Sequence, residues 1–177
     1  MKVLAINGSP RIKNSNTSVI LNPFLDGMKE AGADVDIVHA QKLDIKPCLG
    51  CWTCFLKTPG QCVQKDDMGD LFLQLFTADV VVWATPVFIE GPTAQLKTIV
   101  DRTFVGAGFN PGYEIRNGHQ RLKLVDGFSP SKLVLVSSCG LHEIDNFDRL
   151  LDWVDSLAKM DLFEFVGALL RPHANLL

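Results

Sequence analysis

The polar stretch Asn7–Ser18, NGSPRIKNSNTS, contains the residue types that bind a phosphate group. It follows an apolar run at residues 2–6, which predicts a buried strand, and it precedes an amphipathic segment that predicts a helix. The free N–H groups and the positive dipole end of such a helix attract anions. The alternative is that Asn16 or Thr17 only caps the helix. The side chains that could add hydrogen bonds or positive charge are Ser9, Arg11, Asn14, Ser15, Asn16 and Thr17.

The motifs of two common nucleotide sites are absent from the sequence. There is no G-x-x-x-x-G-K-S/T for a nucleoside triphosphate, and no G-x-G-x-x-G follows the first predicted strand for a dinucleotide. A loop rich in Ser, Asn and Thr suits instead the single phosphate of a mononucleotide. In doubly wound sheets that bind FMN, the ligand lies where the first and third strands diverge.

Four of the five cysteines form a second candidate site, with the spacing Cys48-x2-Cys51-x2-Cys54-x7-Cys62. Four converging thiolates can hold a 4Fe–4S cluster or a structural zinc ion. The overlapping x2 spacing resembles iron–sulfur ligation more than the two separated C-x2-C pairs typical of zinc. A loop of reduced cysteines that binds no metal is the third alternative. In a reducing compartment, a clustered set indicates metal or redox chemistry more than disulfides.

The elements that must position these sites alternate between strands and helices. We expect strands at residues 2–6, 35–38, 79–84, 133–136 and 163–170, and helices at 16–31, 66–76, 93–103 and 145–159. This alternation predicts an α/β fold with a doubly wound parallel sheet in a single domain, 1–177. The near-continuous apolar run at 79–84 suits its central strand. The cysteine-rich loop, 46–65, is far longer than an ordinary connection, which indicates function.

Two further loops should meet the phosphate loop at the carboxyl edge of the sheet. After the third strand, backbone amides could bond the polar edge of a flat ring while Pro86 or Phe88 covers its face. A rigid connection without a ligand is the alternative for this loop. After the fourth strand comes Ser137–Gly140, where Cys139 also suits a small buried residue. The residues expected to meet the ring in the first of these loops are Thr85, Pro86, Val87, Phe88 and Ile89.

Two features of the second half suggest contacts outside the sheet. The glycine-rich stretch 104–131 shows little periodicity, and we expect a lid or a subunit contact there, with Phe109, Tyr113 and His119 as contact residues. Only Arg171–Leu177 follow the last predicted strand, where a fifth helix is usual. Either the chain is truncated or a partner subunit covers the exposed apolar surface, so we expect a homodimer or a higher homo-oligomer.

Length and composition exclude several classes of protein. The chain has 177 residues, 47% of them apolar and 21% charged, with a net charge of −3, which is typical of a globular domain without an electrostatic reason to bind nucleic acid. No apolar run approaches the ~18 residues of a membrane span, and no leader opens the chain. We expect a cytoplasmic location.

Together, GSPRIKNSNT, the cysteine spacing, TPVF…TAQLKTIVDR and SSCG make the chain similar to the iron–sulfur flavoproteins of the NAD(P)H-dependent FMN reductase superfamily, from Lys2 to about Pro172. The resemblance implies a flavodoxin-like sheet of order 2-1-3-4-5, bound FMN and an oligomer. It assigns the flavin phosphate to Ser9, Arg11, Ser15, Asn16 and Thr17, the isoalloxazine loop to 86–89, and a third flavin contact to Ser138, Cys139 and Gly140. It assigns a cluster to Cys48, Cys51, Cys54 and Cys62, although plain FMN reductases share similar cysteines.

These observations favour an FMN-dependent oxidoreductase without an amino-acid nucleophile or acid–base pair, because the flavin supplies the chemistry. NAD(P)H or a reduced carrier would supply electrons for an acceptor such as a flavin or a quinone. The first alternative is a non-catalytic electron carrier that exchanges electrons with ferredoxin. The second is a zinc-stabilised binding module.

Overall fold

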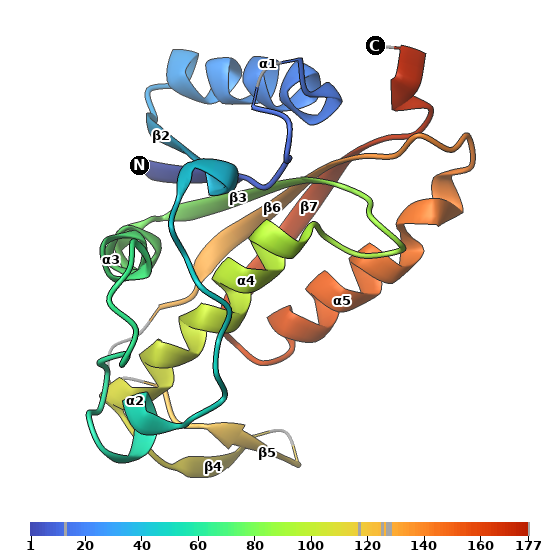
Figure 1. Cartoon of the computed structure of the whole chain (residues 1–177). Helices are drawn as coiled ribbons and strands as arrows, with labels where there is room; N and C mark the ends of the chain where they lie inside the picture. Colours follow the sequence, from blue (N-terminus) through green and yellow to red (C-terminus); the bar gives the residue numbers. More distant parts are fainter. Residues whose placement is uncertain (13, 117, 125, 127–128, 177) are drawn as a thin grey trace.

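The computed structural model describes residues 1–12, 14–116, 118–124, 126 and 129–176, and its centre is a five-stranded parallel sheet (Figure 1). The strand order is β2-β1-β3-β6-β7. These strands are β1 Lys2–Asn7, β2 Asp34–His39, β3 Val80–Pro86, β6 Ser131–Ser138 and β7 Phe163–Arg171. Counted within the sheet alone, this is the expected flavodoxin-like order 2-1-3-4-5, so the predicted fold is confirmed.

Helices cover both faces of the sheet (Figure 1). Helix α1 (Asn16–Glu30) packs on one face, and α3 (Met68–Thr77), α4 (Ala94–Arg102) and α5 (Asp148–Ala158) pack on the other. The predicted amphipathic segments therefore form the expected helices, and Thr93 caps α4 as its position predicts. Helix α1 continues through Pro23, and its buried face centres on Leu21 and Leu25.

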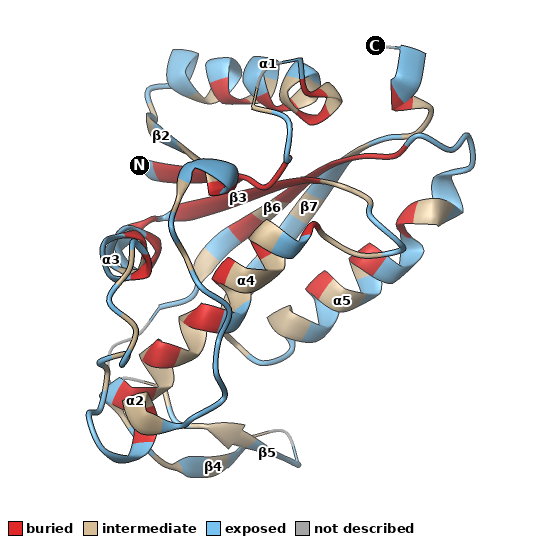
Figure 2. Ribbon diagram, in the orientation of Figure 1, coloured by how far each residue is buried: buried red, intermediate tan, exposed pale blue. Residues whose placement is uncertain are grey.

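The central strands are the most buried part of the molecule, and their side chains point alternately to the two faces of the sheet (Figure 2). Val81 and Trp83 face α3, α4 and α5, whereas Val80 and Val82 face α1. The Trp83 ring stacks on Trp153 at 5.6 Å. Because β3 is buried on both faces, its sequence is continuously apolar, as the central strand of a parallel sheet requires.

The segment 104–131 differs from the expectation of a structureless lid. It contains a 3₁₀ helix, η2 (Thr103–Phe109), and an antiparallel hairpin of β4 (Tyr113–Arg116) and β5 (His119–Leu122). This hairpin lies beside the short helix α2 (Thr53–Leu56) of the cysteine-rich loop and far from the carboxyl edge of the sheet (Figure 1). The prediction missed it because Tyr113–Arg116 alternates over only four residues, the minimum for such a pattern, and His119–Leu122 (HQRL) does not alternate at all. Positions 117, 125, 127 and 128 of this segment lie outside the described residues.

Three further 3₁₀ helices complete the described chain: η1 (Ala40–Lys42), η3 (Ile144–Phe147) and η4 (Ala174–Leu176). The last strand, β7, leaves two large apolar side chains accessible, Val166 at 48% and Leu169 at 40%. Among the described residues, no helix has the length and apolarity needed to cross a membrane.

Candidate functional site

The phosphate-type loop runs from the end of β1 into α1, and hydrogen bonds fix its shape. The Ser9 backbone N–H donates to Asn7 Oδ1 at 3.0 Å, and Asn7 Nδ2 donates to Ser18 Oγ at 2.9 Å. Ser15 is the N-cap of α1, because its Oγ accepts from the Ser18 N–H at 3.3 Å. The cap is therefore neither Asn16 nor Thr17. Position 13 of this loop lies outside the described residues.

The start of α1 has two backbone donors without a partner among the described residues. No described residue accepts a hydrogen bond from the backbone N–H of Asn16 or Thr17. Ser9, Ser15 and Thr17 are buried, whereas Arg11 is exposed. The N–H groups of Asn16 and Thr17 and the helix dipole make the start of α1 suitable for an anion.

Gly8 lies where the loop leaves β1, in close contact with the start of α4. Its N–H donates to the Ala84 carbonyl at 2.7 Å, and its carbonyl accepts from Thr93 Oγ1 at 2.6 Å. A Cβ at Gly8 would lie 2.9 Å from Leu96 Cβ. Sequence analysis missed both Gly8 and Thr93 as site residues, although a glycine directly after the first strand is the signal of such a close approach.

Buried hydrogen bonds join the phosphate loop to the two loops that follow β3 and β6. Thr17 Oγ1 and Ser138 Oγ are 2.9 Å apart, and the Ser138 carbonyl accepts from the Val87 N–H at 2.8 Å. Thr85 is fully buried and accepts at Oγ1 from the Thr93 N–H at 3.1 Å. The three predicted loops thus meet at one edge, beside the point where β1 and β3 diverge.

The loop after β3 ends in a tight and strained turn. Phe88 and Gly91 form an isolated antiparallel bridge, with N–H···O distances of 2.9 and 3.1 Å. Between them, Ile89 and Glu90 have φ angles of 45° and 63°. A β-branched residue in this left-handed region is a genuine outlier. The Phe88 and Ile89 side chains are exposed, at 51% and 100%, so the turn projects from the sheet edge.

Two predicted contact residues, Asn16 and Cys139, have other partners in the structure. The Asn16 side-chain amide donates to the Ala174 carbonyl at 2.6 Å. Cys139 is buried, its N–H donates to the Arg171 carbonyl at 3.0 Å, and its Sγ accepts from the Leu141 N–H at 3.4 Å. Gly140 is exposed on the same turn. Cys139 therefore has the position of a small buried core residue.

The four clustered cysteines line one pocket of about 350 Å³. Its walls also include Trp52 and Phe104, whose ring centroids are 5.0 Å apart. All the cysteines are free thiols. Among the described residues, however, no group of three or more His, Cys, Asp or Glu side chains is arranged to hold a single metal ion. Structural zinc requires four ligands that converge on one point. A 4Fe–4S cluster differs from a single metal ion in what it requires, because each of its iron atoms binds its own thiolate.

The thiols of this pocket differ in their electrostatic environment. Burial raises the pKa of Cys54, and the neighbouring sulfurs of Cys62, Cys48 and Cys51 act in the same direction. The exposed Cys51 has a lowered pKa, chiefly because the Thr53 side chain and N–H hydrogen-bond its sulfur. A positive ion or cluster that neutralises thiolate charge would therefore favour deprotonation at this site.

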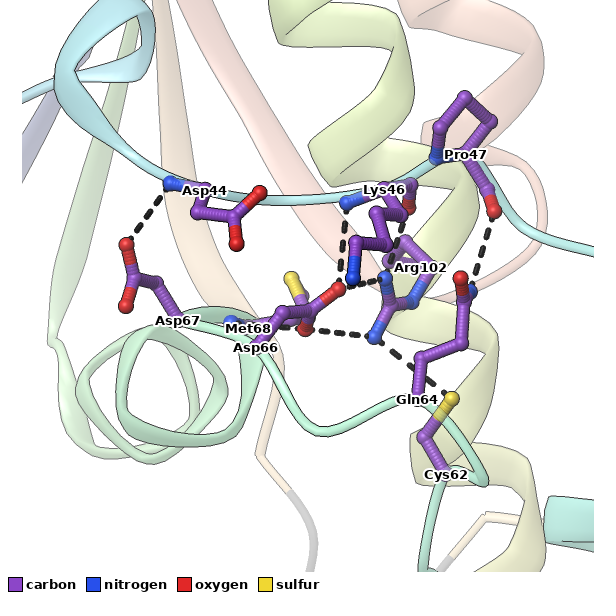
Figure 3. Close-up of polar contacts among 9 residues, drawn as sticks. All are labelled: Asp44, Lys46, Pro47, Cys62, Gln64, Asp66, Asp67, Met68 and Arg102. Carbon is purple, nitrogen blue, oxygen red and sulfur yellow. Dashed lines mark hydrogen bonds and ion pairs between the residues drawn. The ribbon is translucent and has the colours of Figure 1, made fainter.

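A buried ion pair at the base of the cysteine-rich loop escaped sequence analysis (Figure 3). Arg102 at the end of α4 pairs with Asp66, with Nη1–Oδ2 at 2.6 Å and Nη2–Oδ1 at 2.9 Å. The two side chains are only 2% and 0% exposed. The pKa of Asp66 is lowered, mainly by its hydrogen bonds from Arg102, and the same contact raises the pKa of Arg102. Both groups are therefore charged at neutral pH.

The family follows from comparison with known proteins. The sequence model of the family described as NADPH-dependent FMN reductase matches residues 1–120. The chain belongs to the NADPH-dependent FMN reductase family. An iron–sulfur flavoprotein of Archaeoglobus fulgidus is 42% identical over 102 residues, which cover 58% of this chain and 45% of that protein. Another, from Methanocaldococcus jannaschii, is 40% identical over 111 residues, 63% of this chain and 54% of that protein.

This family member spans about half the length of the curated relatives it matches. Solved structures show the same fold at low identity. An FMN-dependent NADH-azoreductase from Bacillus anthracis in complex with FMN has a TM-score of 0.73 at 14% identity, covering 99% of this chain and 89% of that one. An NAD(P)H:quinone oxidoreductase from Methanothermobacter marburgensis has a TM-score of 0.68 at 15% identity, covering 97% and 85%.

Proposed function

We propose that this protein is an FMN-dependent oxidoreductase that takes electrons from NAD(P)H or a reduced carrier and passes them to an acceptor such as a flavin or a quinone. The observation that carries the proposal is the meeting of three loops at the switch point between β1 and β3. Flavin sites of doubly wound sheets lie at this position. Membership of the NADPH-dependent FMN reductase family supports the same cofactor.

The residues at this edge suit the parts of FMN. The phosphate would be held by the backbone N–H groups of Asn16 and Thr17, the hydroxyls of Ser9 and Ser15, and the exposed Arg11. The loop of Pro86, Val87, Phe88 and Ile89 and the turn of Ser138, Cys139 and Gly140 would hold the ring. Bound FMN supplies hydride and electron chemistry, and the protein supplies position and electrostatics. We therefore assign no catalytic side chain.

The cysteine pocket supports a second redox site. We propose that Cys48, Cys51, Cys54 and Cys62 hold a 4Fe–4S cluster, because all four line one pocket and the curated relatives carry the name iron–sulfur flavoprotein. This observation also favours a second candidate function, in which the protein is a non-catalytic electron carrier and exchanges electrons with ferredoxin. The two functions share both cofactors and differ in whether NAD(P)H is a substrate.

We place this activity in a cytoplasmic homo-oligomer. Free thiols suit a reducing compartment. The exposed Val166 and Leu169 on β7 suit a subunit contact with a second copy. A single monomeric species at all concentrations in analytical ultracentrifugation would contradict the oligomer.

The deciding experiment is anaerobic purification followed by flavin, iron and sulfide analysis and by mixing with NADPH. We expect bound FMN and rapid bleaching of its absorbance. Bleaching by reduced ferredoxin alone would favour the electron carrier, and protein that cannot take up FMN would contradict both functions. In Arg11→Gln, we expect FMN binding to weaken by about tenfold, because a charge-assisted contact to the phosphate is lost. The exposed control Arg149→Gln should bind FMN as the wild type does.

A further inference from the structure

The second donor group of Arg102 is directed at the cysteine pocket. While Arg102 pairs with Asp66, its Nη2 group also donates to Cys62 Sγ at 3.5 Å (Figure 3). A buried ion pair in itself is weak evidence of stabilisation, because the desolvation of two charges offsets their attraction. Here the pair is placed so that a permanently charged guanidinium touches one of the four clustered sulfurs.

Arg102 also joins the two ends of the cysteine-rich loop. Arg102 Nη1 donates to the carbonyl of Lys46, at the beginning of the loop, at 2.7 Å. Asp66, the ion-pair partner of Arg102, lies at the end of the loop. The Lys46 N–H donates in turn to Asp66 Oδ2 at 3.1 Å. Gln64 Nε2 donates to the Pro47 carbonyl at 3.0 Å just inside these contacts. The ion pair therefore bonds both the carbonyl and the N–H of Lys46, and in this way it joins the two ends of the loop.

The sequence spacing separates Cys62 from the other three clustered cysteines. Cys48, Cys51 and Cys54 follow one another at intervals of three, and the short helix α2 (Thr53–Leu56) supports the last of them. Cys62 is separated from Cys54 by seven residues that include Pro59 and Gly60. Within this segment the Gly60 N–H donates to the Cys54 carbonyl at 2.9 Å, and the contact with Arg102 additionally ties Cys62 to the end of α4.

We propose that Arg102 is a positioning residue for the iron–sulfur cluster: it fixes Cys62 as the fourth ligand and, by donating a hydrogen bond to that sulfur, raises the reduction potential of the cluster. This inference rests on the cluster proposed above. Reduction adds negative charge to the cluster and its thiolates, and a cationic donor at a ligand sulfur stabilises that charge. Lysine can replace arginine only in part, because only the guanidinium fork can bond both oxygens of Asp66 and still reach the sulfur.

The test compares the wild type with Arg102→Lys, Arg102→Gln and the double variant Asp66→Asn/Arg102→Gln, each reconstituted anaerobically with iron and sulfide. The double variant removes both buried charges, so it avoids an unpaired Asp66 if Arg102→Gln alone does not fold. The measurements are iron and sulfide content and a spectroelectrochemical titration of the cluster. We expect the glutamine variants to shift the equilibrium toward the oxidised cluster by about tenfold, which is about 59 mV for a one-electron couple. The reduction potential of the cluster in Arg102→Lys should lie between the potentials of the glutamine variants and that of the wild type.

The matched control is Arg149→Gln, which removes an exposed arginine from α5 and should leave the potential unchanged. An unchanged potential in the glutamine variants would overturn the redox role of Arg102. Wild-type protein that takes up neither iron nor sulfide would overturn the cluster and this role with it. The loop-closing role has its own measurement, since amide hydrogen exchange at Lys46 should accelerate in the apo form of the glutamine variants. Equal exchange in the variants and the wild type would overturn that role.

Discussion

Thr93 and Arg102 stand at opposite ends of α4 and contact different candidate sites. The Thr93 hydroxyl donates to the Gly8 carbonyl at the phosphate loop, and the Arg102 guanidinium donates to Cys62 Sγ at the cysteine pocket. A helix of nine residues spans roughly 13 Å at about 1.5 Å per residue. In Figure 1, the carboxyl edge of the sheet and the cysteine-rich loop lie at the two ends of this helix. A rigid element thus fixes the separation of the two proposed redox groups.

Replacing Thr93 tests the first end of this helix. Thr93→Val keeps the shape of a fully buried side chain but removes the helix cap and leaves the Gly8 carbonyl without its donor. We expect the free energy of unfolding to fall by about 2 kcal/mol in urea titrations. The control is Thr77→Val, whose hydroxyl bonds the exposed end of α3 and should change stability by less than about 0.5 kcal/mol. Equal losses in the two variants would contradict the role of Thr93.

Gly8 gives a second test of the same contact. A Cβ at this position would meet Leu96 Cβ at 2.9 Å and Thr93 Oγ1 at 3.0 Å, so Gly8→Ala must displace the phosphate loop or α4. We expect FMN affinity to fall by at least about tenfold in fluorescence titrations, since a loss of about 1.4 kcal/mol of binding free energy is enough for that change. Gly27→Ala is the control, because its Cβ meets nothing within 4 Å and lies inside α1. That variant should bind FMN normally and gain about 0.5 to 1 kcal/mol of stability.

Much of the fold was predictable, because local patterns determine it. The continuously apolar β3 and the threonine before α4 identify a buried strand and a capped helix without knowledge of any tertiary contact. The order of the strands followed from the family resemblance. The FMN contacts of the individual residues at the sheet edge remain predictions.

The Arg102–Asp66 pair could not be predicted in the same way. Its two residues are 36 positions apart, and charged side chains are ordinarily exposed, so neither periodicity nor composition indicates that they are buried together. The strained turn at Ile89 is a similar case, because a β-branched residue has no propensity for a positive φ. Both features depend on tertiary contacts that override local preference.

Gly108 tests the packing of η2 against the cysteine-rich loop. A Cβ there would collide with the carbonyl oxygen of Cys54 and the backbone nitrogen of Gly60, so the two backbones can approach only at a glycine. We expect Gly108→Ala to lower the free energy of unfolding by about 1 to 3 kcal/mol and to reduce iron uptake on reconstitution. Gly69→Ala, whose Cβ meets nothing within 4 Å, should do neither. Normal stability of Gly108→Ala would show that the loop accommodates the methyl group.

The buried hydroxyl pair of Thr17 and Ser138 can be tested by a double-mutant cycle. Each of Thr17→Val and Ser138→Ala leaves one buried hydroxyl without its partner, whereas the double variant removes both. We therefore expect the double variant to lose about 1 kcal/mol less than the sum of the single losses. The comparison cycle is Thr17→Val with Ser137→Ala, because Ser137 donates instead to the Thr85 carbonyl. An additive result for Thr17 and Ser138 would mean that their hydrogen bond does not couple the two loops.

His39 at the end of β2 should make stability depend on pH. Its Nδ1 atom is buried without a hydrogen-bond partner among the described residues. The pKa of His39 is lowered from 6.5, first by burial and then by the nearby charge of Lys42. The unfolded chain therefore binds a proton at His39 more readily than the native protein does. As pH falls through about 6.5, protonation favours unfolding, so this contribution to stability is present above that value and is lost below it.

The measurement is the free energy of unfolding in urea between about pH 7 and about pH 5. We expect His39→Gln to lose less stability over this range than the wild type, because glutamine does not titrate. The exposed hairpin variant His119→Gln controls for the removal of a histidine as such and should keep the wild-type dependence. Parallel curves for the wild type and His39→Gln would show that the buried imidazole does not discriminate between the folded and unfolded states, and the pH dependence would then arise elsewhere in the chain.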